Sequence, residues 1–480
     1  MAKRTAIIDI GSNSVRMIIF EKTSRFAFHL LHEAKSRVRI SENAYKNNNY
    51  LQPKPLKRAF NVLEEFQEII KKYKVTKTLC IATSALRDAP NKKEFISKVK
   101  KDIGLKIKVI DGQKEAYLGG IAAANLLYLK DALTIDIGGG STELALYKNK
   151  KVIKTISLNL GTVRLKELFF DTNDIKGAIE YIKAEFNKLD AEFKCENIIG
   201  IGGTLRAFSK MISDKNKVPF NKLHAFSYKI EDEEKFSNKL LNSNEEELKL
   251  IGVKKERLDV IKPGILILST LIQHIQAKHI ISSGVGVREG LFLSDLLRTN
   301  ADKFPHNFNP SIKSLTDRFD TIKNDTNYGA KKLFNLLAET LNINPSYKES
   351  FLQANKISHI GEELNFYNAQ RHAYYTLLNN LNYGFSHQST ILISTLVRFQ
   401  EKGFISSSHL KKYSKYLPEE KEINTLIYLM SLNKIIFGEI NQEVILTLKD
   451  KKLNIEAKYS YLIEDKLSSL KSNLLDISVN

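Results

Sequence analysis

The chain carries Asp9-Ile10-Gly11-Ser12-Asn13-Ser14 near its start and Asp136-Ile137-Gly138-Gly139-Gly140-Ser141 further along, so that Asp, Gly and Ser recur at one offset. Each copy follows a short apolar run and precedes another alternating run, which predicts a strand, a tight glycine turn and a second strand. Glycine lets backbone N–H groups approach an anion closely, hydroxyls donate hydrogen bonds, and carboxylates hold a hard cation that bridges phosphate oxygens. A single copy would also fit an ordinary hairpin, because Gly-Ser turns are common. Two copies in matching contexts predict duplicated domains whose turns face each other across a cleft and clamp phosphate.

The composition favours a polyanionic partner. The 480 residues include 74 Lys plus Arg and 54 Asp plus Glu, a formal net charge of +20. Long-range attraction would then draw nucleic acid, an anionic membrane or a phosphate chain. The alternative is that lysine is simply abundant on solvated surfaces.

Cysteine usage and hydropathy indicate a cytoplasmic protein. Cys80 and Cys195 are the two cysteines, and they form neither a disulfide framework nor a zinc spacing, which fits a reducing cytosol. The longest apolar stretch, 264–272, is shorter than the roughly 20 residues that cross a bilayer. Met1 to Arg4 lead into no signal-peptide core. We therefore expect no membrane association.

Hydrophobic periodicity predicts an α/β fold with a helical tail. Residues 1–130 show the order βββαβαβα, and residues 131–300 restart it with the second glycine turn. The segment 301–311, rich in Pro and Asn, has the composition of a linker. Residues 312–480 are mostly helical and end in two alternating runs, Val444 to Leu448 and Leu453 to Ala457, that predict a late β-hairpin.

Further motifs accompany the two turns and are specific in combination. They are Val15-Arg16, Thr83-Ser84-Ala85-Leu86-Arg87, Gly112-Gln113-Lys114-Glu115-Ala116, Gly202-Gly203-Thr204 and the stretch from Gly284 to Gly290. With them the chain resembles the exopolyphosphatase and guanosine pentaphosphate phosphatase (Ppx/GppA) family. The resemblance implies two actin-like domains of the ribonuclease H-like (ASKHA) class with an interdomain cleft, an HD-like C-terminal domain, and a homodimer.

Glu115 is the candidate general base. It follows a predicted strand and lies in the first turn of a predicted helix, where it could accept a proton from water attacking phosphorus. The alternative is that it only complements the helix dipole. The family's proposed base is the matching glutamate, so the resemblance implies that role for Glu115.

Other site residues divide into arginines, turn residues and carboxylates. Arg16, Arg87 and Arg288 match family positions that face the cleft, and the resemblance implies a catalytic role for Arg16 and Arg87 and phosphate binding for Arg288. Each could instead form a structural ion pair. Phosphate binding is expected of Gly11, Ser12, Asn13, Ser14, Gly138, Gly139, Gly140 and Ser141. Asp9, Asp136 and Glu143 would hold Mg²⁺, with Mn²⁺ possible, although not all three need be ligands and aspartates also serve as turn caps. Gly202, Gly203 and Thr204 would receive a nucleotide or more phosphate.

The C-terminal histidines do not form a metal site of the HD type. Ligation there requires a His-Asp doublet, but Ala373 follows His372 and no such doublet occurs in the chain. We expect these histidines to pack or form hydrogen bonds, and the domain to cradle long anionic substrates or contact a second subunit.

The combined prediction is a Mg²⁺-dependent phosphoanhydride hydrolase. It would release terminal phosphate from inorganic polyphosphate, or convert guanosine pentaphosphate (pppGpp) to the tetraphosphate (ppGpp), or both; nucleic acid is not the expected partner. Two alternatives stay open: an ATP-dependent small-molecule kinase of the same fold, and a polyphosphate or alarmone sensor without catalysis.

Overall fold

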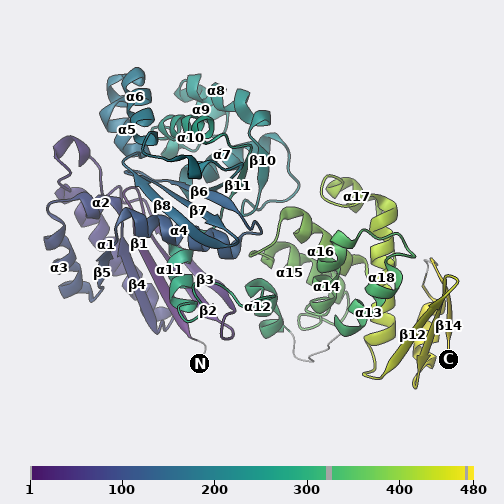
Figure 1. Cartoon of the computed structure of the whole chain (residues 1–480). Coiled ribbons are helices and arrows are strands. Elements are labelled where there is room, and N and C mark those ends of the chain that lie inside the picture. The colour runs from purple at the N-terminus through teal and green to yellow at the C-terminus, as the bar shows by residue number, and fades with distance from the viewer. Residues whose placement is uncertain (1–2, 320–326, 471–473) are drawn as a thin grey trace. The chain divides into compact units, whose positions relative to one another are not determined.

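The protein is seen in a computed structural model that describes residues 3–319, 327–470 and 474–480 (Figure 1). The chain divides into two compact units, Met1–Phe308 and Asn309–Asn480. The division lies within the segment 301–311, whose last two residues already belong to a helix.

The first half of unit one is built on a five-stranded sheet in the order β3-β2-β1-β4-β5. β1 pairs antiparallel with β2 and parallel with β4. The predicted strands and long helices all form, and the structure adds the short helix α2. The elements are β1 (Arg4–Ile10), β2 (Val15–Lys22), β3 (Phe28–Ser36), α1 (Pro53–Lys72), β4 (Lys77–Ala82), α2 (Ser84–Asp88), α3 (Lys92–Ile103), β5 (Ile107–Val109) and α4 (Gly112–Leu126).

The second half repeats this topology in a six-stranded sheet, β10-β11-β9-β6-β7-β8. β6 pairs antiparallel with β7 and parallel with β9, as β1 does with β2 and β4. The duplication predicted from the glycine turns is therefore confirmed, and both halves have the actin-like arrangement. The elements are β6 (Ala132–Ile137), β7 (Thr142–Lys148), β8 (Lys151–Leu158), α5 (Thr162–Leu168), α6 (Ile175–Phe186), β9 (Asn197–Ile201), α7 (Gly202–Lys215), β10 (Ser227–Lys229), α8 (Glu234–Asn242), α9 (Glu245–Leu250), α10 (Ile261–Ile275), β11 (His279–Ser282) and α11 (Val287–Leu296).

Two helices lie between the sheets and join the halves (Figure 1). α4, from the first half, packs on β7 and β8 of the second sheet, and α11, from the second half, packs on β1 of the first. The two helices also contact each other, where Gly290 of α11 meets the backbone of Leu118. A helix crossing this close requires glycine, because any Cβ would collide with that backbone.

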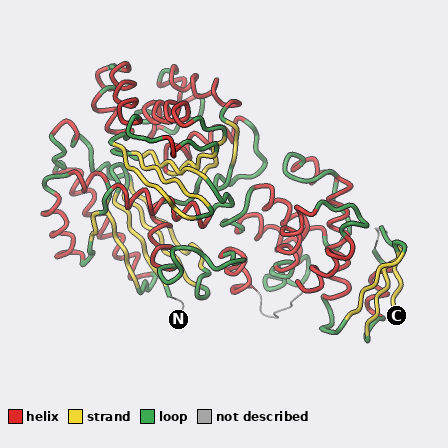
Figure 2. Tube along the Cα trace, in the orientation of Figure 1, coloured by secondary structure: helices red, strands yellow, loops and turns green. Residues whose placement is uncertain are grey.

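Unit two is mainly helical, with a three-stranded sheet near its end (Figure 2). The predicted hairpin forms as β12 and β13, and β14 adds a third strand parallel to β13. The HD-like character of this unit stays a prediction. The elements are α12 (Pro310–Phe319), α13 (Asn327–Leu337), α14 (Lys348–Lys356), α15 (Ala369–Asn380), α16 (His387–Phe399), α17 (Ser407–Tyr413), α18 (Glu420–Phe437), β12 (Val444–Lys449), β13 (Lys452–Ala457), α19 (Tyr461–Ser468) and β14 (Asp476–Val479).

In the parts of the chain that the structure describes, no helix combines the length and the apolar character needed to cross a membrane.

Candidate active site

The two repeated turns close in the same way. The Gly11 N–H donates to the Ser14 carbonyl oxygen at 3.1 Å, and the Gly138 N–H donates to that of Ser141 at 2.9 Å. We refer to Gly11–Ser14 as the first turn and to Gly138–Ser141 as the second turn. Each therefore joins two antiparallel strands, as the sequence predicts.

The two turns lie against each other. A Cβ on Gly139 would lie 3.0 Å from the Ser12 Cβ, and a Cβ on Gly140 would lie 3.3 Å from the Ser12 Oγ. On its other sides Gly140 is bordered by the hydroxyls of Ser84 and Tyr45. Glycine is required because side chains at these positions would separate the turns.

A cavity of about 160 Å³ lies between the halves at these turns. It contains nearly every site residue predicted from the sequence; among them only Arg87 is not part of its wall. The predicted residues that line it are Asp9, Gly11, Ser12, Asn13, Ser14, Arg16, Glu115, Asp136, Gly138, Gly139, Gly140, Ser141, Glu143, Gly202, Gly203, Thr204 and Arg288.

Glu115 is buried at the cavity wall and is placed there by the start of α4. The Asp111 carboxylate caps this helix by accepting a hydrogen bond from the Lys114 N–H at 2.7 Å. Burial raises the pKa of Glu115 well above its usual value, the charge of Glu143 raises it further, and Arg87 opposes the rise. A desolvated carboxylate of this kind is a stronger proton acceptor once ionised.

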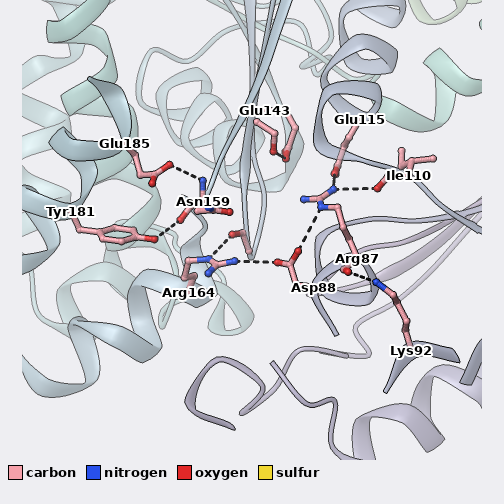
Figure 3. Close-up of polar contacts among 12 residues, drawn as sticks. Arg87, Asp88, Lys92, Ile110, Glu115, Glu143, Asn159, Arg164, Tyr181 and Glu185 are labelled. Carbon is pink, nitrogen blue, oxygen red and sulfur yellow. Dashed lines mark hydrogen bonds and ion pairs between the residues drawn. The ribbon is translucent and has the colours of Figure 1, made fainter. Parts of the chain in front are cut away.

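Arg87 reaches Glu115 from α2. Its Nη1 donates to Glu115 Oε2 at 3.0 Å and points toward the Ile110 carbonyl oxygen at 3.4 Å (Figure 3). We expected Arg87 to face the cleft, but its contact is with the glutamate and it is not part of the cavity wall. Arg87 is therefore placed to orient Glu115 and not to contact a molecule in the cavity.

Three further carboxylates line the cavity: Asp9 near the end of β1, Asp136 near the end of β6 and Glu143 near the start of β7. The sheet registers place Asp9 opposite Arg16 and Asp136 opposite Glu143. Burial raises the pKa of Asp9, that of Asp136 to about 6 and that of Glu143 to about 7. The Ser157 Oγ donates to Glu143 at 2.8 Å. Within the described residues, no three His, Cys, Asp or Glu side chains lie close enough to hold a metal ion by themselves.

Arg16 and Arg288 both line the cavity, but they contact different partners. The Arg16 Nε donates to the Ser14 Oγ at 3.2 Å, so Arg16 supports the first turn. Arg288 is buried, and its Nη1 forms an ion pair with Glu33 Oε1 at 3.0 Å. Arg288 thus makes the structural ion pair that the sequence left open, while it also faces the cavity.

Further cations line the cavity that the sequence did not single out: Lys35, Arg37, Arg206 and Arg257. Lost hydration and neighbouring arginines lower the pKa of Lys35 to about 8, although its side chain is exposed at the rim. Burial together with Arg16 and Arg288 lowers that of Arg206 to about 10. Loss of hydration is the larger cause of both shifts and repulsion among the cations adds to it, so a multiply charged anion would bind favourably here.

The sequence carries a weak signal for three of these cations. Lys35 and Arg37 continue the alternation of side chains along β3, so they are expected on the same face as Glu33. Arg206 follows the Gly-Gly-Thr motif on α7, and its Nε donates to the Gly202 carbonyl oxygen at 2.9 Å. Arg257 comes from a separate segment before α10, and nothing in its local sequence indicates the site.

A second hollow of about 360 Å³ adjoins the first and shares Arg16, Lys35, Gly203, Arg206, Glu256 and Arg257 with it. Its remaining wall is partly apolar and includes Met211, Leu223, Ile251 and Val253. The first hollow is lined by cations and by carboxylates, and the second adds a partly apolar wall.

Two stretches of the chain match described protein families. Residues 18–299 match the Ppx/GppA phosphatase family, and residues 311–474 match Ppx/GppA phosphatase, domain III.

Among curated proteins, the bifunctional 3-dehydroquinate synthase/phosphatase of Fusobacterium nucleatum is 34% identical over 303 residues, which is 58% of this chain. The match spans 44% of the length of that protein.

Among solved structures, the Aquifex aeolicus member of the Ppx/GppA family is 29% identical, with a TM-score of 0.54 over 62% of this chain and 99% of that one. An exopolyphosphatase from Cytophaga hutchinsonii is 23% identical, with a TM-score of 0.56 over 61% of this chain and 98% of that one, and it shares the fold.

Proposed function

Because the chain belongs to the Ppx/GppA phosphatase family, we propose that it is a phosphoanhydride hydrolase that releases the terminal phosphate of a polyphosphate chain or of guanosine pentaphosphate. The observation that carries this proposal is the pair of facing glycine turns, with the buried carboxylate of Glu115 in the same cavity wall.

The turns and cations would hold the transferring phosphoryl group. The hydroxyls of Ser12, Ser14 and Ser141 can donate hydrogen bonds, and Arg16 and Arg206 can neutralise non-bridging oxygens. Phosphoryl transfer is catalysed mainly by such positioning and charge neutralisation. Glu115, ionised and oriented by Arg87, would take the proton of the attacking water.

The donor set fits a magnesium ion. Asp136 and Glu143 are paired in register, and burial raises the pKa of both carboxyl groups, so a bound cation would favour their charged forms. Mg²⁺ usually takes one or two carboxylates and completes its shell with water and substrate oxygens, so a larger cluster is unnecessary. When bound, the ion would offset charge on the phosphate oxygens. Asp9 is a further candidate ligand.

The two hollows suit both proposed substrates. The cations beside the turns favour a chain of phosphates, and the partly apolar wall of the second hollow would accept a nucleoside. The same hollow would also accept ATP, as the kinase alternative requires. A sensor needs no base, so the buried Glu115 favours catalysis over the sensor alternative.

The test is phosphate release by the purified full chain with Mg²⁺, from long-chain polyphosphate and from guanosine pentaphosphate side by side. We expect release from at least one substrate, a ranking of the two by kcat/KM, and loss of release in Glu115→Gln with binding largely retained. No release from either substrate would overturn the proposal, and ADP formation that depends on a hydroxylated acceptor would support the kinase instead. A homodimer and a cytoplasmic location stay predictions.

A further inference from the structure

An ion pair joins the two halves close to Glu115 (Figure 3). Arg164 of α5, in the second half, places its Nη2 3.3 Å from Asp88 Oδ2, at the end of α2 in the first half. The same guanidinium also holds the second turn, because its Nε donates to the Gly140 carbonyl oxygen at 2.8 Å. The Arg164 N–H also donates to the Gly139 carbonyl oxygen at 3.0 Å. Arg164 therefore links the second turn directly to the first half.

Asp88 also contacts the arginine that holds Glu115. Its Oδ1 lies 3.7 Å from the Arg87 Nε, while the Arg87 Nη1 lies 3.0 Å from Glu115 Oε2. Figure 3 shows Arg87 between these two carboxylates, with Arg164 approaching Asp88 from the opposite side. Asp88 and Glu115 thus contact different nitrogens of one guanidinium, and each attracts it toward itself.

The competition is electrostatic and depends on Arg164. The side chains of Arg87, Asp88 and Arg164 are 22%, 27% and 15% exposed, so solvent screens their charges only in part. With Arg164 in contact, the charge of Asp88 is shared between two cations and its attraction for Arg87 is weaker. Without Arg164, Asp88 would draw Arg87 away from Glu115.

The guanidinium of Arg164 is also held in orientation. It lies 4.7 Å from the centre of the Tyr45 ring, in a cation–π contact with a residue of the first half. A flat guanidinium stacked on a ring loses less freedom when it forms an ion pair. Asp88 and Tyr45 of the first half therefore both contact the Arg164 guanidinium.

We propose that Arg164 is a positioning residue that, by pairing with Asp88, commits Arg87 to Glu115 when the two halves close around the second turn. The consequence is that the base is oriented only when the turn that binds phosphate is in place. The inference rests on the proposed function for the role of Glu115, and on the contacts above for the coupling itself.

The activity test is a double-mutant cycle on the full chain, with phosphate release as the assay. Arg164→Gln should lower kcat about tenfold or more with little change in KM, because it affects orientation of the base rather than binding. Asp88→Asn removes the competitor, so it should lower kcat less than about threefold. The double variant should recover at least half of the logarithmic loss of Arg164→Gln, since residues in one network are not additive.

A matched control is Lys46→Gln. Lys46 forms an ion pair with Asp171 at 2.9 Å across the same two halves, but it contacts neither Arg87 nor the second turn. We expect its kcat to equal that of the wild type. A tenfold loss in Lys46→Gln would attribute the effect to general closure of the cleft and would overturn the specific role of Arg164.

A crystal structure of Arg164→Gln gives a readout that does not require activity. We expect the Arg87 guanidinium to lie on Asp88 and its contact with Glu115 to be lost. Arg87 remaining on Glu115, or a double variant no better than Arg164→Gln, would overturn the proposal. If the wild type releases no phosphate, the proposed function fails, and this structure alone decides whether Arg164 positions Arg87.

Discussion

The guanidinium of Arg87 and the carboxylate of Glu115 form a hydrogen-bonded ion pair of 3.0 Å at the cavity wall, in which the carboxylate faces the cavity and the arginine lies outside its wall. The pair sets two properties of Glu115. Its orientation is fixed from α2, and the positive charge counters part of the rise in pKa that burial causes. Both properties bear on its use as a base near neutral pH.

Removing the cation should shift the pH dependence of hydrolysis. In Arg87→Gln the pKa of Glu115 rises further, so a smaller fraction is ionised at neutral pH, and each unit of rise costs about tenfold in rate there. We expect the acidic limb of the kcat profile to move to higher pH, with activity partly recovered under alkaline conditions. Arg298→Gln, at an exposed arginine, is the control. An unshifted acidic limb would mean that Arg87 does not act on Glu115.

Divalent cations should be required. We expect EDTA to abolish phosphate release and Mg²⁺ to restore it. Glu143→Gln and Asp136→Asn should raise the Mg²⁺ concentration for half-maximal rate by about tenfold or more, a loss typical of altered metal surroundings. Asp190→Asn, at a surface carboxylate paired with Lys154, should leave that concentration unchanged. Full activity in EDTA would exclude the magnesium proposal.

The local part of the site is predictable from the sequence, because the turn geometry depends on adjacent residues. Asp-Ile-Gly followed by Ser within a few residues specifies a strand, a hydrogen-bonded turn and a return strand, and the repeat specifies the second half. Glu115 is predictable for a similar reason, since its place follows from a strand and a capped helix start.

The cations that complete the site depend on tertiary contacts and were missed. Lys35, Arg206 and Arg257 come from three separate elements, and only the packing of those elements brings them together. The pairing of Arg164 with Asp88 spans 76 residues, and no local spacing indicates it. α2, with five residues, is too short for a helical period to be visible, and β14 becomes a strand only because β13 offers a free edge.

Alanine should be tolerated at Gly119 of α4 but not at Gly290, where α11 crosses α4. A Cβ on Gly290 would lie 2.5 Å from the Leu118 carbonyl carbon, so Gly290→Ala must separate the helices, at a cost of about 3 kcal/mol. On the partner helix α4, next to Leu118, a Cβ on Gly119 would meet Ile201 Cδ1 at an ordinary 3.5 Å. Gly119→Ala should be neutral or stabilising by up to about 1 kcal/mol. Unfolding in urea measures both, and equal effects would contradict the close crossing.

Unit two should lose stability in mild acid through His409. This histidine is buried, its Nε2 lies 2.9 Å from the Thr395 Oγ1, and burial together with Arg398 and Lys412 lowers its pKa from 6.5 to about 4. Because the folded pKa is below the unfolded one, the unfolded state gains the proton first, and stability falls as pH decreases from 6.5 toward 4.

The size of this effect can be measured by unfolding in urea at pH 7 and pH 5. The free energy of unfolding should fall by about 2 kcal/mol more in the wild type than in His409→Gln, in which the titrating group is absent. His306→Gln, at an exposed histidine, should behave like the wild type. The same pH dependence in His409→Gln would assign the acid sensitivity to other groups.

Removal of unit two should separate the two candidate substrates. A chain ending after Phe308 retains the facing turns, Glu115 and the cations of the cavity. Two solved Ppx/GppA structures from Aquifex aeolicus correspond to 62% and 61% of this chain over 99% and 100% of their own lengths, so a fold of this extent exists by itself.

We expect the shortened chain to keep most of its kcat/KM for guanosine pentaphosphate. Long-chain polyphosphate should lose more, through a higher KM, because unit two would cradle the distant phosphates. The test is a comparison of kcat/KM for both substrates between the shortened and the full protein. An equal loss on both substrates would mean that unit two contributes to stability or assembly and not to holding polyphosphate.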